Sequence, residues 1–354
     1  MNSHATGQTE EQIAEASERR RRRTSWRTVA GFGLCIVFLL GVRVWWGFEA
    51  GRRLRNEIAR IRERGEPLLV DDFNPASDIP DEENAAILYE KASAALVEAK
   101  AGTLSLADFC TDPRVFDAYP QDARALVELN TESLRLLREA RSRGKVDWNV
   151  RLTSPLINFM LPNLSSHRNL AKFGRSVAHV QFRLGDHAAA IETVRDTVKL
   201  GGDVSGTRRT HLITHLVAIA CEALAIQPLE TFTHELAVST GNPGRKTSPT
   251  RSAATRAQIE ALIRELLDEE SLWLGMKCAM PAERATQLDT VQVLVSGKLS
   301  LSGIVGGPAM FLAPLRIAVR PILESDCIYM LQSMSELVHA TTMRSWPAAG
   351  AILD

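Results

Sequence analysis

Two histidines at helical spacing are the first residues of this 354-residue chain whose types could support chemistry. His211 and His215 stand four residues apart in the segment HLITH, which would place both imidazoles on one face of a helix, as in many zinc sites. The zinc-protease motif also requires a glutamate directly after the first histidine as general base, and Leu212 occupies that position. The sequence assigns no third ligand, so we expect no cofactor. His211 and His215 are candidates for a metal site, and ordinary interior or surface histidines are the alternative.

A row of basic residues recurs at three- and four-residue steps between positions 168 and 183. Apolar residues occupy other positions of the same segment, which is therefore predicted to be an amphipathic helix with one basic stripe. Such a stripe could bind an acidic peptide or a carboxylate terminus, and the alternative is a solvated helix face. The predicted binding residues are Arg168, Lys172, Arg175 and His179, and Arg183 continues the stripe.

Two acidic clusters could perform acid–base chemistry, and they consist of Asp268, Glu269 and Glu270, and of Glu324 and Asp326. Paired carboxylates hydrolyse substrates only where the fold holds them on opposite sides of one bond. Nothing in the sequence brings these groups together. Fingerprints of phosphate-binding loops, serine hydrolases, kinases and dinucleotide-binding folds are also missing. We therefore predict no catalytic residue.

The elements that must position these residues are predicted to be helices throughout. Ala, Leu, Glu and Arg are abundant and only 6% of the residues are aromatic, which favours an all-α fold. A formal net charge of +0 argues against a nucleic-acid partner, because such binding relies on neutralising phosphates. The cysteines include no Cys-x-x-Cys pair, and the disulfide state stays open for Cys110, Cys221, Cys278 and Cys327.

One apolar segment near the N-terminus, residues 28–48, is predicted to be a transmembrane anchor. Its 21 residues would span about 31 Å as a helix, which matches the hydrocarbon core of a bilayer. Eleven of them are Val, Ile, Leu or Phe, which favours insertion by roughly 3–7 kcal/mol. Arg43 lies near one end, where its side chain can reach the headgroups, beside Trp45 and Trp46. No small-residue cleavage site follows, so we expect an uncleaved signal anchor.

The rest of the chain divides by composition into five further segments. Residues 1–27 are predicted to be a disordered basic tail, and residues 49–64 a helical stalk. An α-helical hairpin domain is expected over residues 65–239, a polar linker over 240–252 and a C-terminal helical region over 253–354. Within the hairpin domain, leucines at three- and four-residue steps predict one helix from about residue 122 to 143. Residues 299–315 carry no charge but contain Gly and Pro, which favours a buried loop or a segment dipping into the membrane surface over a second span.

The segment GDHAAAIETVRDTVKL, residues 185–200, resembles the turn and second helix of a tetratricopeptide hairpin. Gly185, Asp186, Ala190 and Ile191 fit the pattern, and His187 stands where an aromatic residue is expected. The order of anchor, basic stalk, GEP turn, acidic ENAA helix and Gly-Asp hairpin is also similar to an uncharacterised group of bacterial single-pass membrane proteins. The first resemblance implies a helical-hairpin bundle or solenoid, and the second implies a bacterial membrane protein without assigning an activity.

We therefore expect a membrane-anchored helical scaffold or protein-interaction module of the bacterial envelope, with a metal- or carboxylate-dependent hydrolase as the alternative. The expected partners are membrane lipid, through residues 28–48, and a protein or peptide. Six arginines lie within about ten residues of the anchor on its N-terminal side and three on the other side. This bias predicts a single-pass protein of the inner (cytoplasmic) membrane whose main domain faces outward.

Overall fold

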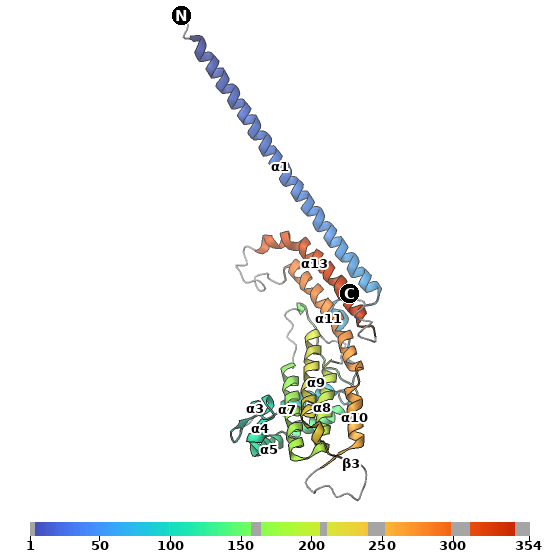
Figure 1. Cartoon of the computed structure of the whole chain (residues 1–354). Coiled ribbons are helices and arrows are strands. Elements are labelled where there is room, and N and C mark those ends of the chain that lie inside the picture. Colours follow the sequence, from blue (N-terminus) through green and yellow to red (C-terminus); the bar gives the residue numbers. More distant parts are fainter. Residues whose placement is uncertain are drawn as a thin grey trace. The chain divides into compact units, whose positions relative to one another are not determined.

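The computed structural model describes residues 4–98, 100–156, 164–205, 211–239, 252–298 and 312–343 (Figure 1). These residues form an all-α fold, in which the strands are limited to the pairs β1–β2 and β3–β4 of two residues each. The all-α prediction is thus confirmed. The chain divides into two compact units, one of Met1–Arg60 with Leu301–Ile328 and one of Ile61–Ser300 with Tyr329–Asp354. Each unit is described by itself.

The first unit contains the long helix α1 (His4–Glu63). From residue 30 onward this helix is apolar enough to cross a membrane, with a mean hydropathy of 1.8 and no buried residue in its most apolar stretch. The predicted apolar N-terminal helix is confirmed. The structure differs at residues 4–27, where the predicted disordered tail is helical. Ala, Glu, Gln and Arg fill the stretch from residue 10 to 23 without a glycine or proline, and these residues have high helix propensity.

Helix α13 (Leu312–Ala340) begins in the first unit and approaches α1 closely at two glycines. A Cβ on Gly47 would lie 3.4 Å from Cγ of Pro321, and one on Gly51 would lie 3.4 Å from Oε2 of Glu324. Small residues at these positions allow the two helices to pack. Of the uncharged segment 299–315, residues 299–311 lie outside the described residues, and the remainder forms the start of α13.

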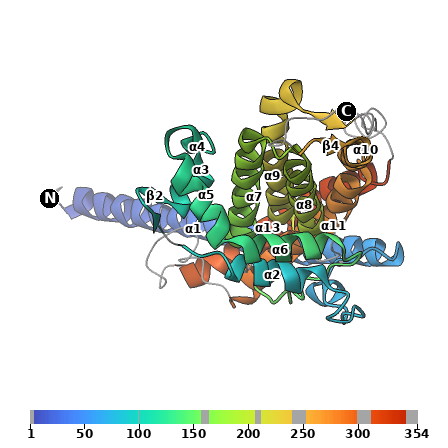
Figure 2. The same cartoon turned by 90° about the horizontal axis from the view of Figure 1, so that it is seen from below.

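The second unit is built around three long helices that stand side by side in Figure 2: α7 (Leu164–Leu184), α8 (His187–Ser205) and α9 (Leu212–Phe232). Shorter elements precede them in the chain: η1 (Val70–Phe73), α2 (Ala85–Ala94), β1 (Lys100–Ala101), β2 (Leu104–Ser105), α3 (Leu106–Thr111), α4 (Val115–Ala118), α5 (Pro120–Leu129) and α6 (Thr131–Arg141). The elements that follow them are η3 (Thr233–Glu235), β3 (Val238–Ser239), β4 (Ala254–Thr255), α10 (Arg256–Leu266) and α11 (Glu270–Ser296).

The turn between α7 and α8 has the geometry that the Gly-Asp dipeptide predicts. Gly185 adopts a left-handed φ of 80°, and the N–H of Asp186 donates to the carbonyl of Gln181 at 2.9 Å, which closes a Schellman turn at the end of α7. The Asp186 carboxylate then accepts from the N–H of Ala189 at 3.2 Å and caps the start of α8. The α7–α8 hairpin is therefore present, whereas the tetratricopeptide resemblance stays a prediction.

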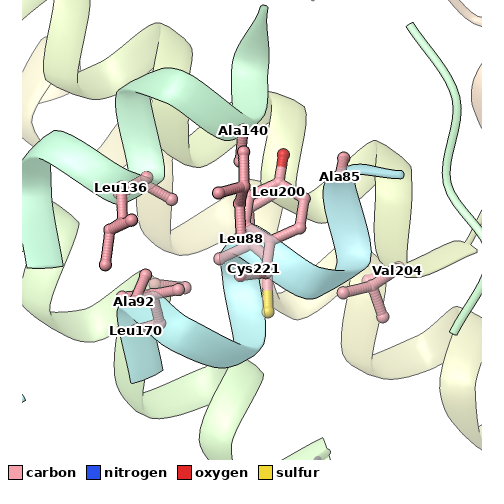
Figure 3. Close-up of a cluster of buried hydrophobic side chains, with 13 residues drawn as sticks. Ala85, Leu88, Ala92, Leu136, Ala140, Leu170, Leu200, Val204 and Cys221 are labelled. Carbon is pink, nitrogen blue, oxygen red and sulfur yellow. The ribbon is translucent and has the colours of Figure 1, made fainter. Parts of the chain in front are cut away.

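The main core lies where α2 and α6 cover the three long helices. Figure 3 shows Leu88 of α2 and Leu136 of α6 among side chains of α7, α8 and α9, such as Leu170, Leu200 and Cys221. All of these are buried, and burial of each large aliphatic side chain contributes about 1.5–3 kcal/mol. This packing holds α8 and α9 in a fixed register, on which the site described below depends.

Two predicted boundaries differ in the structure. The helix expected from residue 122 to 143 is interrupted at Asn130, whose buried side chain donates to the carbonyl of Leu126 and accepts from the N–H of Val97. The predicted linker does not separate two cores, because Ala254 and Leu262 are buried together with residues of α7, α8 and α9. Helices α10 and α11 thus belong to the same unit as the hairpin, and residues 240–251 of the linker lie outside the described residues.

Candidate ligand-binding cavity

A cavity of about 1140 Å³ opens within the second unit, between α8, α9 and the junction of α10 with α11. Binding sites for small molecules typically enclose about 300–1,000 Å³, so this cavity can accept a ligand or a group of side chains. Residues of α8 and α9 face it at helical spacing, and they are Arg195, Val198, Lys199, Gly202 and Asp203 of α8, and His215, Ile219, Glu222, Ala223 and Ile226 of α9.

One wall of the cavity is apolar. The apolar lining consists mainly of Ile219 and Ile226 of α9, Leu266 of α10, and Leu272 and Trp273 of α11. The apolar surface continues outward along α9, since Ile213, Leu216 and Ile219 are 52%, 51% and 39% exposed. The most apolar stretch of this helix has a mean hydropathy of 1.7, long and apolar enough to span a membrane by composition, yet only 28% of that stretch is buried. Helix α9 therefore presents an uncovered apolar face beside the cavity.

The floor of the cavity contains a closed polar cluster around Asp203. Lys199 forms an ion pair with one carboxylate oxygen, and the Tyr89 hydroxyl donates to the other at 2.8 Å. The indole N–H of Trp148 donates to the Asp203 carbonyl at 3.0 Å. Burial raises the pKa of Asp203 and, together with the nearby carboxylates, raises the pKa of Tyr89 well above its usual range. The polar atoms of this cluster satisfy one another, so it contributes structure to the floor.

The other basic side chains that line the cavity are also paired. Arg195 donates to Glu265 at 2.7 Å and to Glu192 at 3.0 Å. Arg141 bonds to Glu192 and lies 3.0 Å from a carboxylate oxygen of Asp196. Lys145, the remaining cation of the lining, pairs with Glu83 at 2.7 Å. Among the lining residues that the structure describes, each Lys and Arg therefore has an acidic partner.

Glu222 is the exception among the carboxylates that face the cavity from α8 and α9. It is half-buried, and within the part of the chain that the structure describes it makes neither an ion pair nor a hydrogen bond. Its side chain lies over a pair of glycines in α8, where a Cβ on Gly201 would come within 2.4 Å of Cγ of Glu222. Burial alone raises the pKa of Glu222 to about 7. The cavity thus holds a carboxyl group that no cation among the described residues compensates.

The two histidines proposed as metal-site candidates are both buried at the start of α9. His215 lines the cavity, and its Nδ1 lies 2.6 Å from Oγ of Ser205, which links α9 to α8. A Cβ on Gly275 of α11 would lie 1.8 Å from that Oγ, so α11 packs directly over the pair. Burial lowers the pKa of His211 and of His215. Among the described residues, no group of three or more His, Cys, Asp or Glu could hold a metal ion.

The basic stripe of α7 is largely covered in the structure, and its role in binding stays a prediction. Arg175 is buried and donates to the carbonyls of Cys110 and Thr111 at 2.6 and 3.0 Å, where it caps the C-terminus of α3. His179 is buried edge-on against Phe232, with ring centroids 4.9 Å apart.

Only the ends of the stripe remain accessible. Arg168 is exposed, Lys172 is half-buried and Arg183 forms an ion pair with Asp117 at 2.7 Å. Most of the stripe is covered because α7 is a central helix that packs against α8, α9 and α3. Its polar side is therefore covered as well as its apolar side.

The two acidic clusters occupy separate units. Asp268 and Glu269 lie at the cavity, where Asp268 accepts from the N–H of Glu270 at 3.0 Å and supports the start of α11. Glu324 is buried in the first unit and accepts from Arg320 at 2.8 Å. Neither cluster brings two carboxylates to opposite sides of one bond. Asp268 and Glu269 instead add negative charge near Glu222.

The cavity was missed by reasoning from the sequence, although two signals for it are present. Gly201 and Gly202 stand together inside a helix, where each glycine costs about 1 kcal/mol relative to alanine, so a close approach of another element is implied. Glu222 is the only charged residue in the apolar run VAIACEALAI. The sequence matches no family model, and neither the curated proteins nor the solved structures contain a significant match to this chain.

Proposed function

We propose that this chain is a membrane-anchored binding protein whose helical domain docks an apolar peptide segment of a partner protein in the cavity along α9. The observation that carries the proposal is the continuity of the apolar cavity wall with the exposed side chains of Ile213, Leu216 and Ile219. These three residues recur every third position along α9, and recognition between a helix and a groove relies on apolar residues at three- and four-residue steps. Glu222, Asp268 and Glu269, which also line the cavity, supply the polar groups that would orient the segment.

The geometry favours binding over catalysis. The polar cluster around Asp203 is closed, and the Ser205 hydroxyl is buried against His215 beneath α11. The hydrolase alternative needs a carboxylate pair or a metal-binding group within reach of a substrate. The described part of the chain gives that alternative no supporting arrangement, so the proposal is built on the cavity.

Membrane attachment through residues 28–48, in the inner membrane of a bacterium with the main domain outside, is part of the same proposal. It is supported by the apolar stretch of helix α1 and by the arginines that precede this stretch. A tethered domain would meet its partner at the membrane surface, where the effective concentration of other membrane proteins is raised.

The test is a selection of peptides against the full-length protein in lipid nanodiscs. A phage-displayed library of 16-residue peptides is selected, and the synthetic peptides are titrated by fluorescence anisotropy against the wild type and Ile219→Glu. The control is Leu129→Glu at the end of α5, a leucine that is 51% exposed, compared with 39% for Ile219, and that does not line the cavity. We expect selected peptides that lose at least about tenfold in affinity with Ile219→Glu, which corresponds to about 1.4 kcal/mol, and that bind the control normally. If every selected peptide binds Ile219→Glu as tightly as the wild type, the proposal is wrong.

A further inference from the structure

We infer that the docked segment carries a lysine or arginine whose side chain pairs with Glu222 of the cavity. This inference rests on the proposed function and specifies the chemistry of the partner. The basic stripe of α7 suggested an acidic ligand, whereas this inference specifies a basic one. The reason is that the stripe is largely covered, and that Glu222, which has no ion pair among the described residues, is acidic.

The charges around the cavity favour a cation over an anion. Arg141, Arg195 and Lys199 each have an acidic partner on α8 or α10, so an incoming carboxylate would have to displace an existing ion pair. Asp268 and Glu269 add exposed negative charge on the α10–α11 side of the same cavity. An approaching cation would meet a surplus of negative potential, which also steers association.

The position of Glu222 fits a partner for a long basic side chain. Its carboxylate has no described hydrogen-bond donor, although it is half-buried, and an unpaired buried charge is costly. An ammonium or guanidinium group would compensate that charge with a charge-assisted hydrogen bond. Formation of the pair therefore adds a favourable interaction that the free protein lacks.

The surrounding apolar wall suits the hydrocarbon stem of the same side chain. Ile219 and Ile226 stand three and four residues from Glu222 on α9, and Leu272 and Trp273 face them from α11. Lysine and arginine bury their methylene groups along apolar surface while the charged end finds a polar partner. The indole of Trp273 offers an aromatic surface that attracts a cation as well. Gly201 leaves the space in which the Glu222 side chain lies.

The experiment uses the same peptide library and the full-length protein in nanodiscs, selected in parallel against wild type and Glu222→Gln. The matched control is Glu230→Gln, an exposed glutamate two turns further along α9 that does not line the cavity. We expect one position of the peptides selected by the wild type and by Glu230→Gln to be enriched in Lys or Arg, and no such enrichment with Glu222→Gln.

A double-mutant cycle then measures the pair itself. The selected peptide and its Lys→norleucine analogue, which keeps the hydrocarbon stem, are titrated against wild type and Glu222→Gln. We expect norleucine to weaken binding to the wild type about tenfold or more and to change binding to Glu222→Gln by less than about twofold. Equal losses in both proteins would overturn the pairing with Glu222. If the selected peptides lose affinity with Ile219→Glu but carry no basic residue, this inference is wrong and the proposed function stands. If no selected peptide loses affinity with Ile219→Glu, both are wrong.

Discussion

Gly201 lies directly beneath Glu222, so that a Cβ at position 201 would come within 2.4 Å of Cγ of Glu222 and 3.1 Å of its backbone nitrogen. The neighbouring glycine is different, because a Cβ on Gly202 would find no atom closer than 4.0 Å. The first glycine is required by the packing of α8 on α9, and the second is not. This difference between adjacent residues gives a direct test of the cavity floor.

Gly201→Ala should lower the free energy of unfolding by about 1–3 kcal/mol, because the added methyl group overpacks the α8–α9 contact. Gly202→Ala should leave stability unchanged or raise it by up to about 1 kcal/mol through higher helix propensity. The measurement is denaturant unfolding of the full-length protein in detergent, followed by circular dichroism at 222 nm. Equal destabilisation by both substitutions would show that α9 does not approach Gly201 as the structure describes.

Arg175→Met should destabilise the protein by about 1–3 kcal/mol, because two carbonyls at the end of α3 would lose their buried donor. Lys172→Met, on the same helix and half-buried, should change stability by less than about 0.5 kcal/mol. The same unfolding measurement compares the two variants. If both behaved like the wild type, Arg175 would be free to bind a ligand, as the sequence suggested.

The stability of the protein should depend on pH through Glu222. Burial raises the pKa of this carboxyl to about 7 in the folded state, compared with about 4.3 for an ordinary glutamate. Between about pH 4.3 and about pH 7, Glu222 is therefore protonated in the folded state and ionised in the unfolded state. The contribution of this group to stability is complete below about pH 4.3 and is lost as the pH rises through 7. A glutamine at this position does not ionise, so Glu222→Gln does not lose this stability. The melting temperature of Glu222→Gln minus that of the wild type should therefore increase from pH 5 to pH 8.5.

Comparison with Glu222→Gln isolates one group among several that titrate near the cavity. Among the described residues, the other titratable or charged groups that line it are Arg141, Lys145, Arg195, Lys199, Asp203, His215, Glu265, Asp268 and Glu269. These residues are present in both proteins, so their contributions cancel to first order in the difference of melting temperatures. A difference that stays constant from pH 5 to pH 8.5 would exclude a raised pKa for Glu222.

Two arginines in the middle of the apolar stretch should release the protein from the membrane. Each central arginine costs about 2.5–3.5 kcal/mol, so Val37→Arg with Leu39→Arg offsets most of the roughly 3–7 kcal/mol that favours insertion. The wild type should stay in the membrane pellet after washing with alkaline carbonate, and the double variant should be extracted. A control with Val97→Arg and Leu129→Arg, exposed on the helical domain, should pellet like the wild type. Extraction of the wild type by carbonate would refute the anchor.

Local signals in the sequence were sufficient for the helices whose ends are marked by special residues. Gly185 and Asp186 specify the α7–α8 turn through a left-handed φ and a side-chain cap, both of which involve only neighbouring residues. The interruption at Asn130 was not predictable in the same way, because its side chain accepts from Val97, 33 residues earlier. The periodicity of leucines across residue 130 favoured a single helix instead.

The candidate site could not be predicted because burial depends on the tertiary arrangement. The pattern of α7 distinguishes a basic side from an apolar side, but it does not reveal that α3 covers the basic side at Arg175. In the same way, the sequence shows Glu222 only as one polar residue in the apolar run of a core helix, and it does not indicate a cavity there. That it lines one cavity with Trp273, 51 residues later in the chain, becomes apparent only when α11 is placed beside α9.

The most direct test of the account is to locate a bound peptide on the protein. A selected peptide is synthesised with a photoreactive benzoylphenylalanine one helical turn from its basic residue, bound to the full-length protein in nanodiscs, irradiated and mapped by mass spectrometry. We predict crosslinks to α9 and the start of α11, at residues such as Ile219, Ile226 and Leu272, which excess unlabelled peptide abolishes. Crosslinks confined to the accessible end of α7, around Arg168 and Lys172, or to the apolar part of α1 would contradict it.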